Sequence, residues 1–194
     1  MDKISYALGM NIAQSLKASG VETINYTKFA EGLEVAFEGK AGDMDAQEAN
    51  QALQQFFSEL QAKQHEGNIQ AGKDFLAENA KQEGIITLES GLQYEVITVG
   101  DGATPAATDQ VECHYHGTLI DGTVFDSSVQ RGEPAVFPVN GVIQGWVEAL
   151  QMMPVGSKWK LYVPSDLAYG ERGAGNHIGP HTTLIFEVEL LGIK

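Results

Sequence analysis

Hydrophobic side chains recur at helical spacing through the first part of the chain. The first stripe consists of Ile4, Leu8, Ile12 and Leu16. The second stripe consists of Phe29, Leu33, Ala36 and Phe37. Glycines at positions 20 and 39 follow the two stripes, and glycine commonly ends a helix. The pattern therefore predicts two amphipathic helices that end at these glycines.

A third and longer helix is predicted from about residue 43 to residue 82, with Asp43 as a suitable cap. Its first part carries apolar side chains at helical spacing, namely Ala49, Leu53, Phe56, Phe57 and Leu60. Residues 61–73 have almost none, and Gly67 and Gly72 each cost about 1 kcal/mol relative to alanine. A helix that is polar all round is usually exposed or unstable. We interpret residues 61–73 as a solvated spacer with possible bending points.

Beyond residue 84 the period of the pattern changes from helical to alternating. Alternation predicts strands over four segments, 91–100, 111–116, 158–163 and 183–191. Asp121-Gly122 stands between two apolar pairs, as in a tight hairpin. Residues 145–153 read as one short helix. Strands with a single helix packed on them indicate an α+β domain with an antiparallel sheet.

The distribution of proline places the boundary between these parts. Residues 1–84 contain no proline, and all six prolines lie after residue 104. We therefore predict a helical domain over residues 1–84 and a strand-rich domain over residues 85–194. Three short helices make a small core, so the helical part is expected to self-associate; a monomeric three-helix cap is the alternative.

Charge and composition exclude several classes of function. The net charge is −14, from 26 acidic and 12 basic residues, and an acidic chain is repelled by nucleic acid and by anionic membranes. No apolar run approaches the roughly 18 residues that span a bilayer. The start of the chain lacks the features of a secretory signal, so a cytoplasmic location is expected rather than a periplasmic one.

Motifs for covalent or metal-dependent chemistry are absent from the sequence. There is no phosphate-binding loop, dinucleotide fingerprint or nucleophile elbow. His114 and His116 share one strand face, but no third ligand has suitable spacing, so we predict neither a metal nor a cofactor. The single cysteine, Cys113, alternates with core residues and is expected to be a buried, inert thiol.

What remains is a group of aromatic residues close to one carboxylate. The group consists of Tyr115, Phe125, Asp126, Trp146, Tyr169 and Phe186. Asp126 follows Phe125 directly, and a carboxylate beside an apolar cavity usually has a partner. Either Arg131 or Tyr169 could supply that partner.

The motifs around these residues resemble those of the FKBP-type peptidyl-prolyl cis–trans isomerases. They are GTVFDSS at 122–128, VIQGW at 142–146, MPVG at 153–156, AYG at 168–170 and IGPHTTLIF at 178–186. Their order and spacing match over about residues 90–194. The N-terminal half resembles the helical dimerisation domain of the two-domain bacterial members, the macrophage infectivity potentiator-like group. SYALG at 5–9 and the glycine three residues after Phe29 carry that likeness.

The resemblance implies an antiparallel half-barrel sheet wrapped on one short helix, with an apolar pocket between them. Trp146 would form the floor under the substrate proline, and Asp126 and Tyr169 would supply a polar edge. The implied catalytic residues are Tyr115, Phe125, Asp126, Trp146, Tyr169 and Phe186. The implied substrate-binding residues are Arg131, Phe137, Val142, Ile143 and Ile178, with the Ile143 N–H bound to a carbonyl and Ile178 closing the rim.

The resemblance also implies partners and an activity. These are proteins with X–Pro bonds as substrates, macrolide inhibitors as possible ligands and a homodimer through residues 1–60. Rotation about an X–Pro bond needs no acid, base or nucleophile, so the lack of such groups agrees with an isomerase. A chaperone or a proline-segment or macrolide-binding module with little turnover is the alternative, and an acidic scaffolding adaptor is a third reading.

Overall fold

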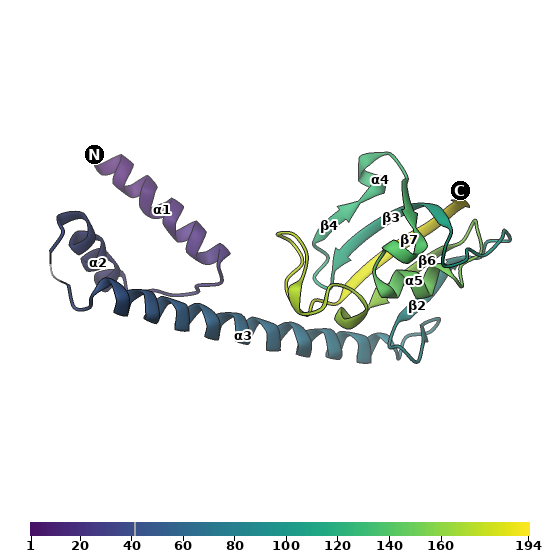
Figure 1. Ribbon diagram of the computed structural model, residues 1–194, viewed down its shortest axis with the longest axis horizontal. Helices are drawn as coiled ribbons and strands as arrows, with labels where there is room; N and C mark the ends of the chain where they lie inside the picture. Colours follow the sequence, from purple (N-terminus) through teal and green to yellow (C-terminus); the bar gives the residue numbers. More distant parts are fainter. Residues whose placement is uncertain (41) are drawn as a thin grey trace. The chain divides into compact units, whose positions relative to one another are not determined.

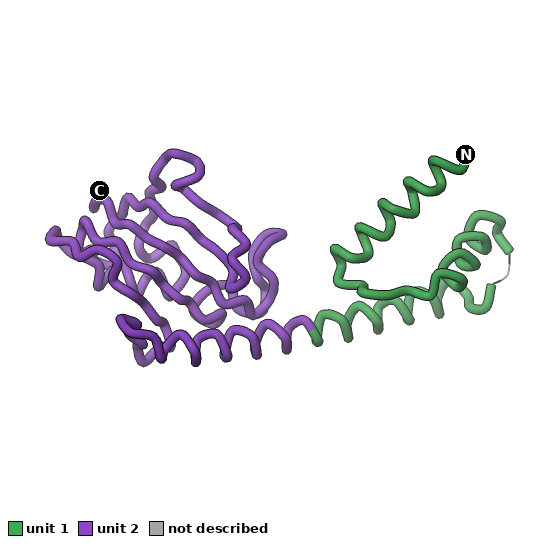
Figure 2. The backbone as a smooth tube through the Cα atoms, turned by 180° about the vertical axis from the view of Figure 1, so that it is seen from behind, with its two compact units in different colours: residues 1–63 green, residues 64–194 purple. Residues whose placement is uncertain are grey.

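The computed structural model describes residues 1–40 and 42–194, which form two compact units, residues 1–63 and 64–194 (Figure 2). The observed division lies inside a helix and before the boundary near residue 84 that the sequence suggested. The reason is that the last part of that helix packs on the strand-rich unit. Within the described residues no helix has both the length and the apolarity needed to cross a bilayer.

The first unit consists of helices (Figure 1), and most of their apolar side chains are exposed. α1 spans Asp2–Ala18, α2 spans Tyr26–Glu38, and the first part of α3, Ala46–Asn79, completes the unit. The side chain of Asn25 caps α2 by accepting a hydrogen bond from the Lys28 N–H, and Gly39 ends it with φ 62°. Among the described residues 1–63, only Val21 is buried. The predicted helices are therefore present, but this unit has almost no core of its own.

The second unit is built on one antiparallel sheet of seven strands. The strands are β1 Ile86–Thr87, β2 Gln93–Thr98, β3 Gln110–Leu119, β4 Val124–Ser127, β5 Ala135–Pro138, β6 Lys158–Val163 and β7 Leu184–Ile193. Their order is β1-β2-β6-β7-β3-β4, with β5 paired to β3. The Asp121-Gly122 hairpin joins β3 to β4, and Gly122 has the positive φ that its turn requires.

The core of this unit lies between the sheet and α5, which spans Gln144–Leu150 (Figure 1). The predicted inward faces are confirmed on three strands. Val111, Cys113 and Tyr115 of β3 are buried, as are the alternate residues of β6 and β7. Short strands β1 and β5 and the single-turn helix α4, Ser128–Arg131, were not predicted, because segments this short carry no periodic signal.

The structure corrects the interpretation of residues 61–73 as a solvated spacer. Gly72 is buried, and His65, Asn68 and Ile69 are half-buried on the same face of α3. The face is polar because it meets backbone groups and small polar side chains of the second unit rather than an apolar core. An alanine methyl group at position 72 would lie 2.4 Å from Thr183 Oγ1, so this glycine permits close packing, and it lies within the continuous helix α3.

Candidate active site

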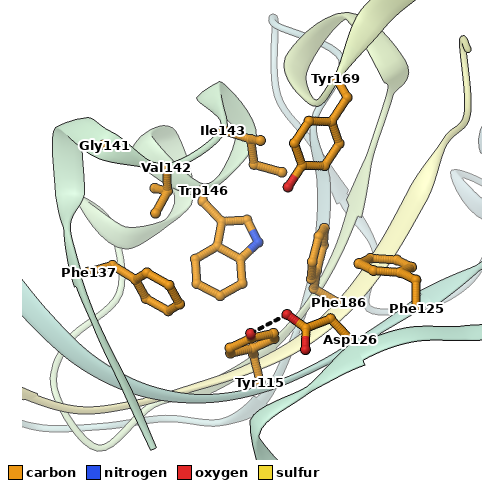
Figure 3. A pocket seen from close by; sticks show the side chains of 10 residues that line it. All are labelled: Tyr115, Phe125, Asp126, Phe137, Gly141, Val142, Ile143, Trp146, Tyr169 and Phe186. Atoms are coloured by element: carbon orange, nitrogen blue, oxygen red, sulfur yellow. Dashed lines mark hydrogen bonds between the residues drawn. The ribbon is translucent and has the colours of Figure 1, made fainter. Parts of the chain in front are cut away.

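One cavity of about 420 Å³ opens between α5 and the concave side of the sheet (Figure 3). Aromatic and aliphatic side chains form most of its wall, and one carboxylate lies at its edge. Its lining consists of Tyr115, Phe125, Asp126, Phe137, Gly141, Val142, Ile143, Trp146, Tyr169 and Phe186. A largely apolar cavity with a few polar groups is the usual form of a small-molecule or peptide-segment site.

Trp146 forms the centre of the cavity wall (Figure 3). Its side chain is 3% exposed, and the rings of Tyr115, Phe137 and Phe186 surround it edge to face at centroid distances of 5.3–5.8 Å. These contacts fix the plane of the indole ring. The indole Nε1 is buried and has no hydrogen-bond partner among the described residues, so the ring presents an apolar surface with one unused donor.

The position of Trp146 follows from the close approach of α5 to the sheet. Gly145 precedes it, and a Cβ atom there would lie 2.6 Å from a methyl carbon of Val163 on β6. A larger residue at position 145 would push the first turn of α5 away from the strand. Ile143, in extended conformation, is the N-cap of α5, and its side chain lies at the cavity mouth (Figure 3).

The polar edge is a triad of Asp126, Tyr115 and Arg131. Asp126 accepts hydrogen bonds from the Tyr115 hydroxyl and from the Arg131 guanidinium, and that guanidinium also donates to the Tyr115 hydroxyl oxygen at 2.8 Å. Partial burial raises the pKa of Asp126, but the hydrogen bonds from Tyr115 and Arg131 and the arginine charge lower it more. The net pKa lies below the ordinary value, so the carboxylate is ionised at neutral pH.

The Tyr115 hydroxyl keeps its proton and donates it in a hydrogen bond to Asp126. Burial raises the pKa of Tyr115 above its ordinary value, and the Asp126 carboxylate raises it further, while Arg131 opposes both. Tyr115 therefore donates to Asp126 throughout the neutral range. Of the two partners that the sequence left open for Asp126, the structure selects Arg131; Tyr169 lies at the cavity mouth instead (Figure 3).

A buried serine that the sequence analysis did not single out fixes the backbone of Tyr115. The Ser128 hydroxyl accepts from the Tyr115 N–H at 2.7 Å and donates to the Tyr115 carbonyl at 3.2 Å. It is fully buried. The sequence could have indicated this role, because Ser128 lies only two residues after Asp126 in the GTVFDSS segment. A hydroxyl buried there needs hydrogen-bond partners, and nearby backbone groups can supply them.

His114 and His116 each pair with a serine hydroxyl, at 3.1 Å to Ser128 and 2.9 Å to Ser127. Residues 1–40 and 42–194 hold no group of three or more potential ligands placed for a metal ion. Cys113 is buried, and burial, with a contribution from Glu112, raises the pKa of its thiol to about 12. The thiol is therefore protonated, and it lies in the core.

The cavity gathers nine of the eleven residues that the sequence analysis assigned to the site. Arg131 does not line it and acts through its bonds to Asp126 and Tyr115. Ile178 was expected at the rim, but it does not line the cavity and is buried with the core. Gly141, in the single turn before α5, is a lining residue that the sequence analysis missed.

Comparison with known proteins gives two family matches that together cover most of the chain. Residues 102–191 match the model described as FKBP-type peptidyl-prolyl cis-trans isomerase. Residues 1–96 match the model described as the domain amino terminal to FKBP-type peptidyl-prolyl isomerase. The two matches correspond to the strand-rich and helical parts of the sequence.

Individual relatives extend the match over nearly the whole length. The FKBP-type 22 kDa peptidyl-prolyl cis-trans isomerase of Escherichia coli is 52% identical, over 97% of this chain and 93% of its own. The Outer membrane protein MIP of Legionella longbeachae is 43% identical, over 100% of this chain and 85% of its own. The crystal structure of FkpA from Escherichia coli superposes with a TM-score of 0.81 at 37% identity, covering 99% of this chain and 93% of that one.

These matches confirm the resemblance and the fold class inferred from the sequence. The helical first part, the long helix and the antiparallel sheet with one packed helix all have counterparts in the superposed structure. The aromatic cavity lies within the part that matches the isomerase model. The chain belongs to the FKBP-type peptidyl-prolyl cis-trans isomerases and is a peptidyl-prolyl cis-trans isomerase.

Proposed function

We propose that this isomerase acts on X–Pro bonds of folding proteins by placing the proline ring against Trp146. The observation that carries the proposal is the buried indole face, which three aromatic rings hold at the centre of a cavity of about 420 Å³. A cavity of this size accepts a proline ring and the residue on either side of it.

The apolar cavity favours the twisted state of the amide over the planar states. The planar bond has partial double-bond character and a rotation barrier of about 18–20 kcal/mol. The twisted bond loses resonance and charge separation, so it is the less polar species and loses less hydration on entering an apolar site. Stronger binding of the twisted state lowers the barrier, and about 8 kcal/mol would give a millionfold acceleration.

Two sets of groups orient the peptide in this proposal. The triad of Asp126, Tyr115 and Arg131 provides fixed charge and a fixed hydroxyl at one edge. The Ile143 backbone N–H and the Tyr169 hydroxyl bind peptide carbonyls in this proposal, because both residues line the cavity. None of these groups has to exchange a proton during the rotation.

The test is the cis-to-trans rate of a short X–Pro peptide with Trp146→Leu in the full chain. We expect a loss of about tenfold or more in kcat/KM, because the substituted floor no longer matches the proline ring. Val147→Ala, the next residue on α5, packs on the core but does not line the cavity, so it is the matched control. Near-ultraviolet circular dichroism checks that both variants fold, and full activity of Trp146→Leu would refute the proposal.

We further propose that residues 1–60 form a homodimer. The support is the row of apolar side chains left exposed on α1 and α2, including Tyr6 at 74%, Leu8 at 59% and Phe37 at 88%. Helices with faces of this kind are stable when a partner covers them. Sedimentation equilibrium of the full chain should give about twice the chain mass of 20.9 kDa. A mass of one chain at all concentrations would contradict the dimer.

The same uncovered surface supports a second candidate function, chaperone-like binding of unfolded clients. An apolar surface on the same chain as an isomerase site raises the local concentration of substrate without any new contact at the site. Suppression of client aggregation that survives Trp146→Leu would favour this function. Loss of suppression together with turnover would assign both effects to the cavity.

A further inference from the structure

The last part of α3 presents one continuous face to the strand-rich unit. His65, Asn68, Gly72, Phe75 and Asn79 lie on it, at steps of three and four residues. All five are buried or half-buried, whereas Gln70 and other residues between them are exposed. This face therefore belongs to the same compact unit as the active site.

The end of this face is anchored on strands β2 and β6 of the sheet. The Asn79 side-chain amide donates to the Gln93 side-chain oxygen at 2.9 Å, and Gln93 in turn donates to the Leu76 carbonyl at 2.9 Å. The ring of Phe75 lies 6.0 Å from that of Tyr162 on β6. These contacts fix the helix against β2 and β6, and none of the residues that make them lines the cavity.

The beginning of the face meets the loop that precedes β7. The Asn68 side-chain amide donates to the Pro180 carbonyl at 2.7 Å, and the His65 ring stacks edge to face on His181 at a centroid distance of 5.5 Å. Between the two regions, Gly72 allows the helix to approach Thr183. The helix thus reaches a loop that is far from it in sequence.

The Pro180–His181 peptide unit connects this helix face to the cavity. Its carbonyl oxygen accepts from Asn68, and its N–H donates to the Gly170 carbonyl at 2.8 Å. His181 has φ 54°, a left-handed conformation that a non-glycine residue adopts only when its surroundings hold it there. Gly170 directly follows Tyr169, which lines the cavity and is 41% exposed.

We infer that Asn68 is a positioning residue for the isomerase reaction. It holds Tyr169 at the cavity mouth through the Pro180–His181 peptide and the Gly170 carbonyl. Among the described residues the Tyr169 side chain makes no hydrogen bond, so its backbone sets its place, and the next carbonyl, that of Gly170, is held by the His181 N–H. The inference rests on the proposed role of the cavity in binding the X–Pro segment.

The first test compares Asn68→Asp with Gln70→Ala in the full chain. Asn68→Asp keeps the shape of the side chain but puts an oxygen where the donor was. Gln70 is exposed and its side chain bonds to Asp74 on its own helix, so it is the matched control. We expect Asn68→Asp to lower kcat/KM for an X–Pro peptide by about three- to tenfold, as loss of one hydrogen bond allows, and Gln70→Ala to leave it unchanged.

The second test asks whether the effect passes through Tyr169. In a Tyr169→Ala background, Asn68→Asp should have little further effect on kcat/KM, because the group that it positions is gone. Hydrogen exchange of the His181 amide provides a readout apart from activity. The exchange rate should rise in Asn68→Asp and stay at the wild-type value in Gln70→Ala.

Three results would overturn the inference: unchanged kcat/KM in Asn68→Asp, unchanged exchange at His181, or an effect of Asn68→Asp that adds fully to that of Tyr169→Ala. An additive effect would mean that Asn68 supports the domain in general. A different result would contradict the proposed function, namely full activity of Trp146→Leu. That result does not depend on the behaviour of the Asn68 variant.

Discussion

The two units of this isomerase use similar apolar side chains with opposite outcomes. In residues 1–63 the apolar stripes of α1 and α2 are present, but neither helix contains a buried residue. In residues 64–194 the apolar faces of β3, β6, β7 and α5 close on one another and form a continuous core. Hydrophobic periodicity thus indicates an apolar face that is stable when other apolar groups bury it. Residues of the same chain bury such faces in the second unit but leave them exposed in the first.

The difference predicts where each unit obtains its stability. The second unit buries its core within one chain, so its stability should not depend on protein concentration. The first unit needs a surface from elsewhere, and in the proposed homodimer a second copy supplies it. Substitutions in both units test this contrast.

The largest expected effect is on the core of the second unit. Leu161 on β6 is fully buried, and Leu161→Ala should lower the free energy of unfolding by about 2–5 kcal/mol. Urea unfolding followed by tryptophan fluorescence measures it, because both tryptophans lie in this unit. The loss of unfolding free energy should be the same at every protein concentration. A loss that depends on concentration would mean that the second unit also relies on another chain for its stability.

Leu8→Ala is the same substitution in the first unit, where the side chain is 59% exposed within one chain. In a monomer it should cost almost nothing. In the proposed homodimer it should weaken association by about 1.5–3 kcal/mol for each chain, the scale for burying one leucine. Sedimentation velocity measures the shift. Val99→Ala, at an exposed site in the second unit, is the control, and peptide isomerisation should be unchanged in both variants.

The third prediction concerns two glycines in the long helix. Gly72→Ala should destabilise the second unit by about 1–3 kcal/mol through its clash with buried Thr183. Gly67→Ala meets nothing within 4 Å and should stabilise the helix by about 1 kcal/mol. Thermal unfolding of the two variants should therefore shift in opposite directions. Equal shifts would restore the interpretation of residues 61–73 as a free spacer.

The smallest expected effect is the pH dependence of the Asp126 triad. Folding lowers the pKa of Asp126, so its contribution to stability is complete above the ordinary carboxyl pKa and is lost as the pH falls through the lower folded value. The difference in unfolding free energy between wild type and Asp126→Asn should be constant near neutral pH and shrink in acid. Urea titrations at a series of pH values measure this difference. A difference that grows in acid would mean that folding raises the pKa of Asp126, which would contradict the prediction.

The same triad predicts that turnover depends little on pH. Asp126 titrates below its ordinary pKa of 3.8 and Tyr115 above its ordinary pKa of 10.0, so neither changes charge between these values. The rate constant kcat/KM for an X–Pro peptide should therefore be flat over this range. A bell-shaped profile would indicate a proton transfer that the cavity does not provide for.

Much of the fold could be predicted from the chain because long periodic segments carry a strong signal. The alternation of Val111, Cys113 and Tyr115 gave the inward face of β3, and the spacing of Ile4 and Leu8 gave α1. Short elements such as β5 could not be predicted, because four residues allow too few periods to separate a strand from a loop. The polar face of α3 was misread, since a face that packs on backbone carbonyls shows no apolar stripe.

The candidate site divides in the same way. Motif spacing placed Trp146, Phe186 and Asp126 together, and the structure brings them to one cavity. It did not reveal that Ile178 is buried in the core or that Asn68, more than a hundred positions before Pro180, donates a hydrogen bond to the Pro180 carbonyl. Such contacts depend on where backbone atoms of distant segments meet.

The sequence by itself determined the helical and strand-rich parts, the inward faces of the long strands and the set of aromatic residues around Trp146. These features could be predicted because periodicity, turn chemistry and the order of motifs are properties of residues that are close in the sequence. Only the tertiary structure decided that Arg131 is the partner of Asp126, that Ser128 clamps Tyr115 and that the end of α3 is part of the catalytic unit. Each of these depends on the direction of a hydrogen bond or on a close approach between segments, which the fold alone brings together.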